Sequence, residues 1–266
     1  MMNAFEAFIL GLVQGLTEFL PVSSSGHLTI AKHLFGIETG DLTFEILVHA
    51  ATVLATIVVF RKEILELLQG LFKFKYNAQT RYVAMICLSM IPVLIVGVFL
   101  KDKVEALFGS GLAVVGGALL LTAALLMLGE WLSSHRNAPG GEMSYKTAAW
   151  MGVAQAVAVI PGLSRSGSTI AAGLMCGTKR SEVAQFSFLM VLVPILGEAF
   201  LDLVGGDTAA SSGIGVWPLV IGFVTAFVSG MFACKVMIAI VKKAKLKWFA
   251  LYCVIAGIAC LFDFFM

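Results

Sequence analysis

Charged residues are scarce in this chain. Asp, Glu, Lys and Arg make up 13% of its 266 residues, against about 25% in an ordinary soluble domain. Hydrophobic residues make up 59%, and the mean hydropathy is +0.97. This composition excludes a sizeable soluble domain and indicates a helical protein that crosses a membrane several times. The net charge of +2 gives no sign of a nucleic-acid partner.

The chain also lacks a cysteine pattern and an early basic segment. Its five cysteines are odd in number, form no Cys-x-x-Cys pair and lie in or beside apolar segments. We therefore expect small core residues, not disulfides or metal ligands. The first basic residue is Lys32, and the apolar stretch before it carries Glu6, Gln14 and Glu18. The sequence therefore predicts no signal peptide.

Long apolar runs are what the chain does have. Six of them are long enough to cross a bilayer as single helices: 43–60, 82–100, 111–132, 183–204, 216–235 and 248–266. Two more, 4–36 and 147–177, are interrupted near their centres by Pro-, Ser- and Gly-containing segments at 21–26 and 161–167. Each half is too short to span, so each stretch predicts a re-entrant helix–loop–helix hairpin.

The two interrupted stretches resemble each other. Gly11 and Gln14 in the first match Gly152 and Gln155 in the second. Three spans follow each hairpin, so the second half must be inverted relative to the first. The sequence predicts a single all-α polytopic membrane domain with six transmembrane helices and two re-entrant hairpins. Its halves, about 1–135 and 145–266, form an inverted-topology repeat with a site near the midplane.

Basic residues are distributed unevenly over the predicted loops. Most of the 18 Lys and Arg residues fall on one side, whereas the other side has only Lys32, Lys101 and Lys103. The basic side should be cytoplasmic. Both termini would then lie outside, and the two hairpins would enter from opposite sides so that their tips can meet.

The second interruption carries Arg165 at the predicted depth of the membrane centre. An ionisable residue there is costly and indicates function. A guanidinium can grip phosphate with two hydrogen bonds, hydroxyls add donors, and glycine lets the backbone approach. The neighbours of Arg165 supply these groups: Ser164, Ser166, Gly167, Ser168 and Thr169.

The first interruption carries an acid, a histidine and three serines. Glu18 lies four residues after Gln14, so both share one helix face. Next to a bound anion, Glu18 would need a divalent cation, a proton or a pair with Arg165. The second half-helices of both hairpins would point positive dipole ends inward, which favours an anion such as phosphate. The remaining candidates at this tip are Ser23, Ser24, Ser25, Gly26 and His27.

Two segments, QGLTEFLPVSSSGH at 14–27 and PGLSRSGST at 161–169, resemble the signatures of the undecaprenyl-diphosphatase family of the bacitracin-resistance type. The resemblance extends along the whole chain. It implies removal of the terminal phosphate of undecaprenyl diphosphate, which recycles the lipid carrier for cell-wall synthesis and confers bacitracin resistance. It also implies dependence on a divalent cation, Mg²⁺ or Ca²⁺. The location implied is the bacterial inner membrane, with the active site open to the outer side.

The resemblance assigns roles to residues of both tips. Glu18 would bind the metal or assist the base, Ser24 would be the candidate nucleophile, His27 its proton partner and Arg165 the phosphate clamp. Whether Ser24 or His27 attacks phosphorus stays open. Gln14 would support Glu18, but it stands where some members have Glu and cannot supply charge to a metal. The phosphate would be bound by Ser23, Ser25, Gly26, Ser164, Arg165, Ser166, Gly167 and Thr169.

Alternative interpretations stay open. Inverted repeats with interrupted helices are a transporter design, so a polyprenyl-phosphate transporter or flippase is the second hypothesis. A homodimer is also left open. For His49 in the span 43–60, an interhelical hydrogen bond is favoured over a position lining the cavity. The stretch 61–76 has an amphipathic pattern and is expected to lie on the cytoplasmic surface.

Overall fold

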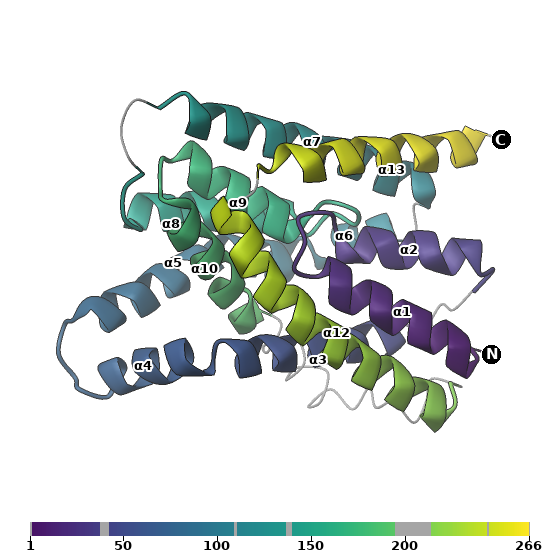
Figure 1. The fold of residues 1–266 in the computed structure, drawn as a ribbon, viewed down its shortest axis with the longest axis horizontal. Helices are drawn as coiled ribbons and strands as arrows, with labels where there is room; N and C mark the ends of the chain where they lie inside the picture. Colours follow the sequence, from purple (N-terminus) through teal and green to yellow (C-terminus); the bar gives the residue numbers. More distant parts are fainter. Residues whose placement is uncertain are drawn as a thin grey trace.

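The computed structural model describes residues 2–37, 43–108, 111–136, 140–194, 214–243 and 245–265. Within these ranges the chain is helical, and the single β-bridge joins Gly141 to Thr178. The prediction of an all-α fold is confirmed. The helices are α1 (Ala4–Thr17), α2 (Ser24–Leu34), α3 (Thr43–Val59), α4 (Arg61–Leu71), α5 (Ala78–Phe99), α6 (Lys101–Phe108), α7 (Leu112–Ser134), α8 (Tyr145–Val157), α9 (Arg165–Met175), α10 (Arg180–Met190), α12 (Val216–Lys243) and α13 (Lys247–Phe265) (Figure 1).

Three helices of the described ranges are long and apolar enough to cross a membrane, namely α5, α7 and α12. A fourth candidate arises if α3 and α4, which meet at an angle of 73°, count as one bent span. Helices α5, α7, α12 and α13 begin within four residues of the predicted starts. In the predicted span 183–204, α10 ends at Met190, and residues 195–204 lie outside the described ranges.

The stretch 61–76 contains the predicted amphipathic helix. Helix α4 exposes Leu65, Leu68 and Leu71. The turn after it exposes Phe72 and Phe74. With α5, α4 forms an antiparallel pair that extends to the left in Figure 1.

Both interrupted stretches are helix–loop–helix pairs, as predicted. Helices α1 and α2 are separated at residues 18–23, and α8 and α9 at residues 158–164. Each second helix begins after a serine N-cap whose hydroxyl accepts a hydrogen bond from the amide of a glycine three residues later. The distances are 3.2 Å from Gly26 N to Ser23 Oγ and 3.1 Å from Gly167 N to Ser164 Oγ.

The repeated glycines allow close helix packing. A Cβ on Gly11 would lie 2.5 Å from the carbonyl oxygen of Gly222 in α12, and a Cβ on Gly152 would lie 2.4 Å from that of Ser89 in α5. Helix α1 therefore packs tightly on α12, and α8 on α5. Each interrupted stretch is held by a helix that is distant in sequence.

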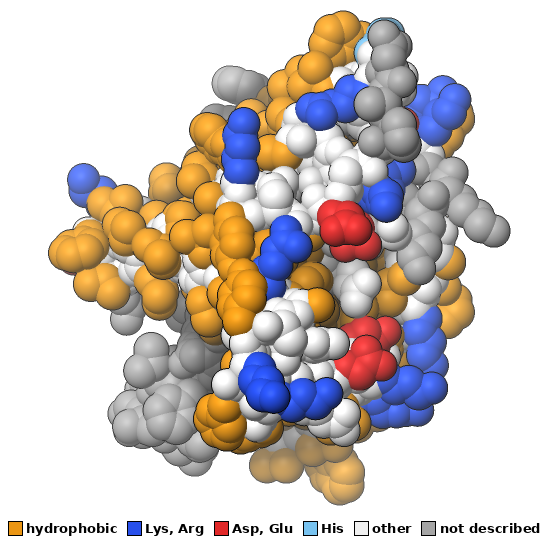
Figure 2. All heavy atoms as spheres, turned by 90° about the vertical axis from the view of Figure 1, so that its left-hand side faces the viewer, with side chains coloured by type: hydrophobic (Ala, Val, Ile, Leu, Met, Phe, Trp, Pro, Cys, Tyr) orange, Lys and Arg blue, Asp and Glu red, His pale blue; other side chains and the backbone are white. Residues whose placement is uncertain are grey.

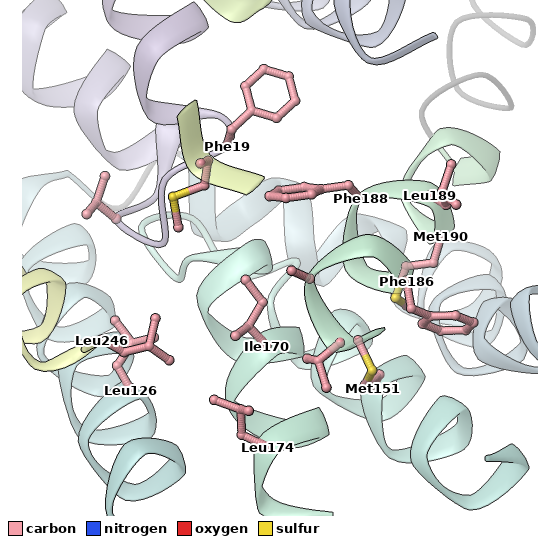
Figure 3. Close-up of a cluster of buried hydrophobic side chains, with 14 of the residues drawn as sticks. Phe19, Leu126, Met151, Ile170, Leu174, Phe186, Phe188, Leu189, Met190 and Leu246 are labelled. Atoms are coloured by element: carbon pink, nitrogen blue, oxygen red, sulfur yellow. The ribbon is translucent and has the colours of Figure 1, made fainter. Parts of the chain in front are cut away.

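A buried apolar cluster includes residues of both helix–loop–helix pairs. Phe19, next to Glu18, is 3% exposed and meets Phe188 edge-on with ring centroids 6.0 Å apart. Ile170 and Leu174 of α9 and Met151 of α8 belong to the same cluster (Figure 3). The first loop is thus anchored in the core through Phe19, and the helices of the second pair through Met151, Ile170 and Leu174.

The chain termini and the turn between α4 and α5 lie at opposite ends of the molecule. Both termini lie at one end, at the right of Figure 1. The opposite face, seen in Figure 2, carries several Lys and Arg side chains beside apolar and acidic ones. The turn between α4 and α5 lies toward this face.

Candidate active site

Glu18 ends helix α1 at the first tip. Its backbone N–H donates to the Gln14 carbonyl, which makes it the C-cap residue. The Gln14 side-chain amide donates to Glu18 Oε2 at 3.0 Å, and both side chains are buried. The predicted common helix face is therefore present, and it directs the carboxylate to the end of the helix.

Ser24 is the first residue of α2 and lies against the same carboxylate. Its hydroxyl donates to Glu18 Oε2 at 2.5 Å. The preceding N-cap residue, Ser23, has a φ of +71°. This left-handed conformation is strained for any residue other than glycine. This conformation lets the chain turn sharply from the loop into α2.

Arg165 joins the second tip to the first. Its Nη2 forms an ion pair and hydrogen bond with Glu18 Oε1, across 147 residues of sequence. Ser166 Oγ also donates to the Leu20 carbonyl at 3.0 Å, and Gly162 N lies 3.5 Å from Ser25 Oγ. The two tips therefore meet, and Glu18 has the arginine partner that was one of its three expected possibilities.

The second tip also contacts α7 and α10. Gly162 has a φ of +86°, and a Cβ there would lie 2.7 Å from Val115 Cα in α7. Ser164 N donates to Thr122 Oγ1 of α7 at 3.0 Å. Thr169 Oγ1 lies 2.7 Å from Ser187 Oγ of α10. These contacts orient α9 so that Arg165, its first residue, faces the first tip.

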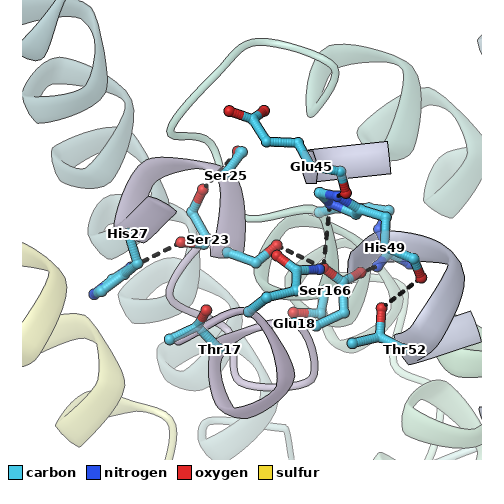
Figure 4. Close-up of polar contacts among 12 residues, drawn as sticks. Thr17, Glu18, Ser23, Ser25, His27, Glu45, His49, Thr52 and Ser166 are labelled. Carbon is cyan, nitrogen blue, oxygen red and sulfur yellow. Dashed lines mark hydrogen bonds and ion pairs between the residues drawn. The ribbon is translucent and has the colours of Figure 1, made fainter. Parts of the chain in front are cut away.

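His27 does not pair with Ser24, contrary to expectation. Its Nδ1 lies 2.7 Å from the Ser23 carbonyl oxygen. Its Nε2 lies 2.6 Å from the Tyr252 hydroxyl, and the two rings stack with an interplanar angle of 13°. Figure 4 shows His27 pointing away from Glu18. The His27 ring lies against Tyr252 of α13. The Ser24 hydroxyl donates to Glu18 and not to His27.

A residue outside both motifs stands beside the carboxylate. His49 of α3 has its Nε2 3.7 Å from Glu18 Oε2, while its Nδ1 lies 2.8 Å from the Glu45 carbonyl oxygen (Figure 4). Its side chain is 29% exposed, against 6% for Glu18. Sequence reasoning favoured an interhelical hydrogen bond for His49 over a position lining the cavity, and it gave no sign of Tyr252.

The backbone amides of Gly26 and Gly167 donate hydrogen bonds within the protein. Both were expected to bind phosphate, but each donates to the N-cap serine of its own helix. Near them, the Ser168 hydroxyl is 2% exposed and has no hydrogen-bond partner. The other predicted phosphate-binding residues, Ser23, Ser25, Ser164, Ser166 and Thr169, lie at the two tips as expected from the sequence.

The side-chain oxygen atoms of Glu18 and Gln14 suit a hard cation that also takes oxygen atoms from a substrate. The described ranges contain no group of three or more His, Cys, Asp or Glu side chains that could hold a metal ion alone. However, Gln14 Oε1 is buried without a hydrogen-bond partner beside Glu18. A carboxylate plus a carbonyl oxygen fits Mg²⁺ or Ca²⁺ if phosphate completes the coordination.

Comparison with known proteins places the chain in a family. Residues 7–259 match the family described as bacitracin resistance protein BacA. The chain is 57% identical to an undecaprenyl-diphosphatase of Bacteroides fragilis over 261 residues, which cover 97% of both chains. The undecaprenyl-diphosphatase of Parabacteroides distasonis is 58% identical over the same share of both chains. That of Carboxydothermus hydrogenoformans is 40% identical over 98% of this chain and 97% of its own. The chain therefore belongs to the bacitracin resistance protein BacA family.

Proposed function

We propose that this protein hydrolyses undecaprenyl diphosphate to undecaprenyl phosphate and inorganic phosphate. The family and the names of its relatives support this activity. The structural observation that carries the proposal is the contact of Ser24 and Arg165 with one buried carboxylate, Glu18. The activity recycles the lipid carrier of cell-wall synthesis and confers bacitracin resistance.

Ser24 is the nucleophile in the proposed reaction. Its oxygen attacks the terminal phosphorus while its proton passes to Glu18, which already accepts its hydrogen bond at 2.5 Å. The bond from that phosphorus to the bridging oxygen breaks, Glu18 passes its proton to the phosphate group that departs, and undecaprenyl phosphate leaves. Water then attacks the phosphoserine and gives a proton to Glu18. The bond from phosphorus to Ser24 Oγ breaks, Glu18 returns the proton to that oxygen, and phosphate is released.

Arg165 binds the phosphate that is transferred. Because its guanidinium pairs with Glu18 in this structure, a substrate phosphate must compete for it. Two parallel N–H donors suit phosphate oxygens, and the charge stabilises the transition state. The serine hydroxyls of both tips and Thr169 provide further polar contacts around the same junction.

A divalent cation, Mg²⁺ or Ca²⁺, is part of this proposal. Glu18 and the unpartnered carbonyl oxygen of Gln14 would hold it. When bound, the cation supplies charge neutralisation to the diphosphate. The proton role first expected for His27 is assigned to Glu18, since the His27 ring lies against Tyr252.

The membrane arrangement is proposed to be the inverted repeat with six spans and two re-entrant hairpins. Matching serine caps on α2 and α9 support it, as does the packing of α1 on α12 and of α8 on α5. We place the basic face of Figure 2 in the cytoplasm. Both termini and the opening of the site then face the outer side of the bacterial inner membrane.

A lipid transporter is the second candidate. The two facing helix–loop–helix pairs favour it, because such pairs form the substrate sites of many transporters. A transporter needs an anion site but has no use for a serine hydroxyl held by a carboxylate. The two functions therefore differ in their dependence on Ser24.

Phosphate release from a long-chain polyprenyl diphosphate tests the proposal. The purified protein in detergent is assayed with Mg²⁺, with Ca²⁺ and with EDTA. We expect release that EDTA abolishes and that Ser24→Ala reduces at least about 100-fold, as for other activated nucleophiles. The exposed serine Ser134 serves as a control, with Ser134→Ala close to the unchanged protein. No release from folded protein, together with lipid exchange in vesicles that survives Ser24→Ala, would favour the transporter.

A further inference from the structure

His49 is fixed in one hydrogen-bonding state by its own helix. Its Nδ1 lies 2.8 Å from the backbone carbonyl oxygen of Glu45, one turn earlier in α3. A carbonyl oxygen can only accept, so Nδ1 carries the hydrogen and donates it. In the neutral ring, Nε2 therefore presents a lone pair.

That lone pair faces a carboxylate. The distance from His49 Nε2 to Glu18 Oε2 is 3.7 Å, which is too long for a direct hydrogen bond. Two electron-rich atoms at this distance, one of them on a buried carboxylate, favour a positive species between them. A divalent metal makes bonds of about 2.0–2.2 Å to imidazole nitrogen and carboxylate oxygen, so one ion can contact both atoms at this separation.

Two further observations point to a cation at this place. A histidine that binds a metal usually donates its other ring N–H to a backbone carbonyl or carboxylate, which fixes the ring, and His49 has this arrangement. In addition, Gln14 Oε1 is buried without a partner, although Gln14 itself bonds to Glu18.

We propose that His49 is a ligand of the divalent cation, together with Glu18, and that substrate phosphate oxygens complete the coordination. This inference rests on the proposed function. It adds a ligand from α3, outside both signature segments, at a site where Gln14 brings no charge. Because imidazole suits transition metals better than it suits Ca²⁺, Mn²⁺ should bind more tightly than Ca²⁺.

The proposal excludes the other histidine near the site. Both ring nitrogens of His27 have partners within the protein, the Ser23 carbonyl and the Tyr252 hydroxyl. His33 is also excluded, since it lies at the surface beside Asp263. These two histidines provide matched controls.

Electron paramagnetic resonance with Mn²⁺ as the probe tests the proposal. Full-length protein in detergent, with its affinity tag removed, is loaded with Mn²⁺ and inorganic phosphate, and electron spin-echo modulation is recorded. We expect nitrogen modulation from a coordinated imidazole. His49→Gln should abolish it, whereas His27→Asn and His33→Gln should retain it. His49→Ala should weaken Mn²⁺ binding at least about 10-fold, the loss typical of an altered metal site.

Other outcomes overturn the proposal in distinguishable ways. Bound Mn²⁺ without nitrogen modulation, or modulation that persists in His49→Gln, removes His49 as a ligand. Phosphate release is measured on separate portions of the same preparations, without added inorganic phosphate. If release is normal in the unchanged protein while the nitrogen signal is missing, the inference fails and the proposed function stands. If release is missing while the signal is present, the proposed function fails.

Discussion

Glu18 is contacted by side chains from four helices. Gln14 reaches it from α1, Ser24 from α2, His49 from α3 and Arg165 from α9. A buried carboxylate is tolerated only when its charge is paired and its oxygens receive hydrogen bonds. The site is therefore a mutual arrangement in which each partner of Glu18 depends on the others.

Removing the Arg165 side chain should lower both the stability and the activity of the protein, and a second substitution should restore only the stability. Arg165→Ala leaves Glu18 as an unpaired buried charge, which costs about 3–5 kcal/mol in comparable pairs. The double variant Arg165→Met with Glu18→Gln removes both charges and should recover most of this loss. Phosphate release should stay abolished in both. Thermal unfolding in detergent and the release assay measure the two effects, and an active double variant would contradict the assignment.

The Tyr252 hydroxyl should position His27. Tyr252→Phe keeps the stacked ring but removes the 2.6 Å contact to His27 Nε2. A hydrogen bond between neutral groups is worth about 0.5–1.5 kcal/mol. Loosening His27 in the first turn of α2, which also carries Ser24, should therefore lower kcat roughly 2- to 10-fold with little change in KM. Tyr76→Phe, in the turn after α4, is the control; equal rates for both variants would remove the positioning role.

At the scale of elements, the interrupted helices follow directly from sequence. Prolines, serines and glycines inside apolar runs predicted both helix–loop–helix pairs, and the paired motifs predicted that Glu18 and Arg165 belong together. The expected pairing of Ser24 with His27 is not formed in the structure. The two residues lie three positions apart on α2, but the His27 side chain turns toward Tyr252 in α13. A contact with a distant helix depends on tertiary packing, which local spacing does not encode.

The same limit explains why His49 was not assigned to the site. In an apolar helix, a single histidine carries no periodic signal that tells which neighbour it faces. Its contact with Glu18 arises because α3 packs near the end of α1. Only the three-dimensional arrangement brings this ring beside a motif that lies thirty residues earlier in the chain.

Close packing of α8 on α5 should be needed to hold the second tip. In Gly152→Ala, the new Cβ would lie 2.4 Å from the Ser89 carbonyl oxygen, so the helices must separate. Such overpacking typically costs about 1–3 kcal/mol, and it should also displace Arg165 and lower phosphate release. Gly117→Ala is the matched control, since no atom lies within 4 Å of the added Cβ. Equal melting temperatures for both variants would contradict the close contact.

For the whole molecule, the proposed orientation has a direct chemical test. Asn3 lies at the terminal end, and Tyr76 lies in the exposed turn at the opposite end. In an active variant without native cysteines, Asn3→Cys should react with a membrane-impermeant maleimide added to intact bacterial cells whose outer barrier is permeable. Tyr76→Cys should react only after lysis. The reverse labelling pattern would invert the proposed topology.

Trapping of the covalent intermediate examines the shared site itself. Purified protein is mixed with polyprenyl diphosphate labelled in its terminal phosphate, quenched rapidly in acid and mapped by mass spectrometry. We expect the label on Ser24, slower formation in Glu18→Gln and none in Arg165→Ala, because both tips must contribute. Label on another residue, or rapid hydrolysis without any label on Ser24, would contradict the assignment of Ser24 as the nucleophile.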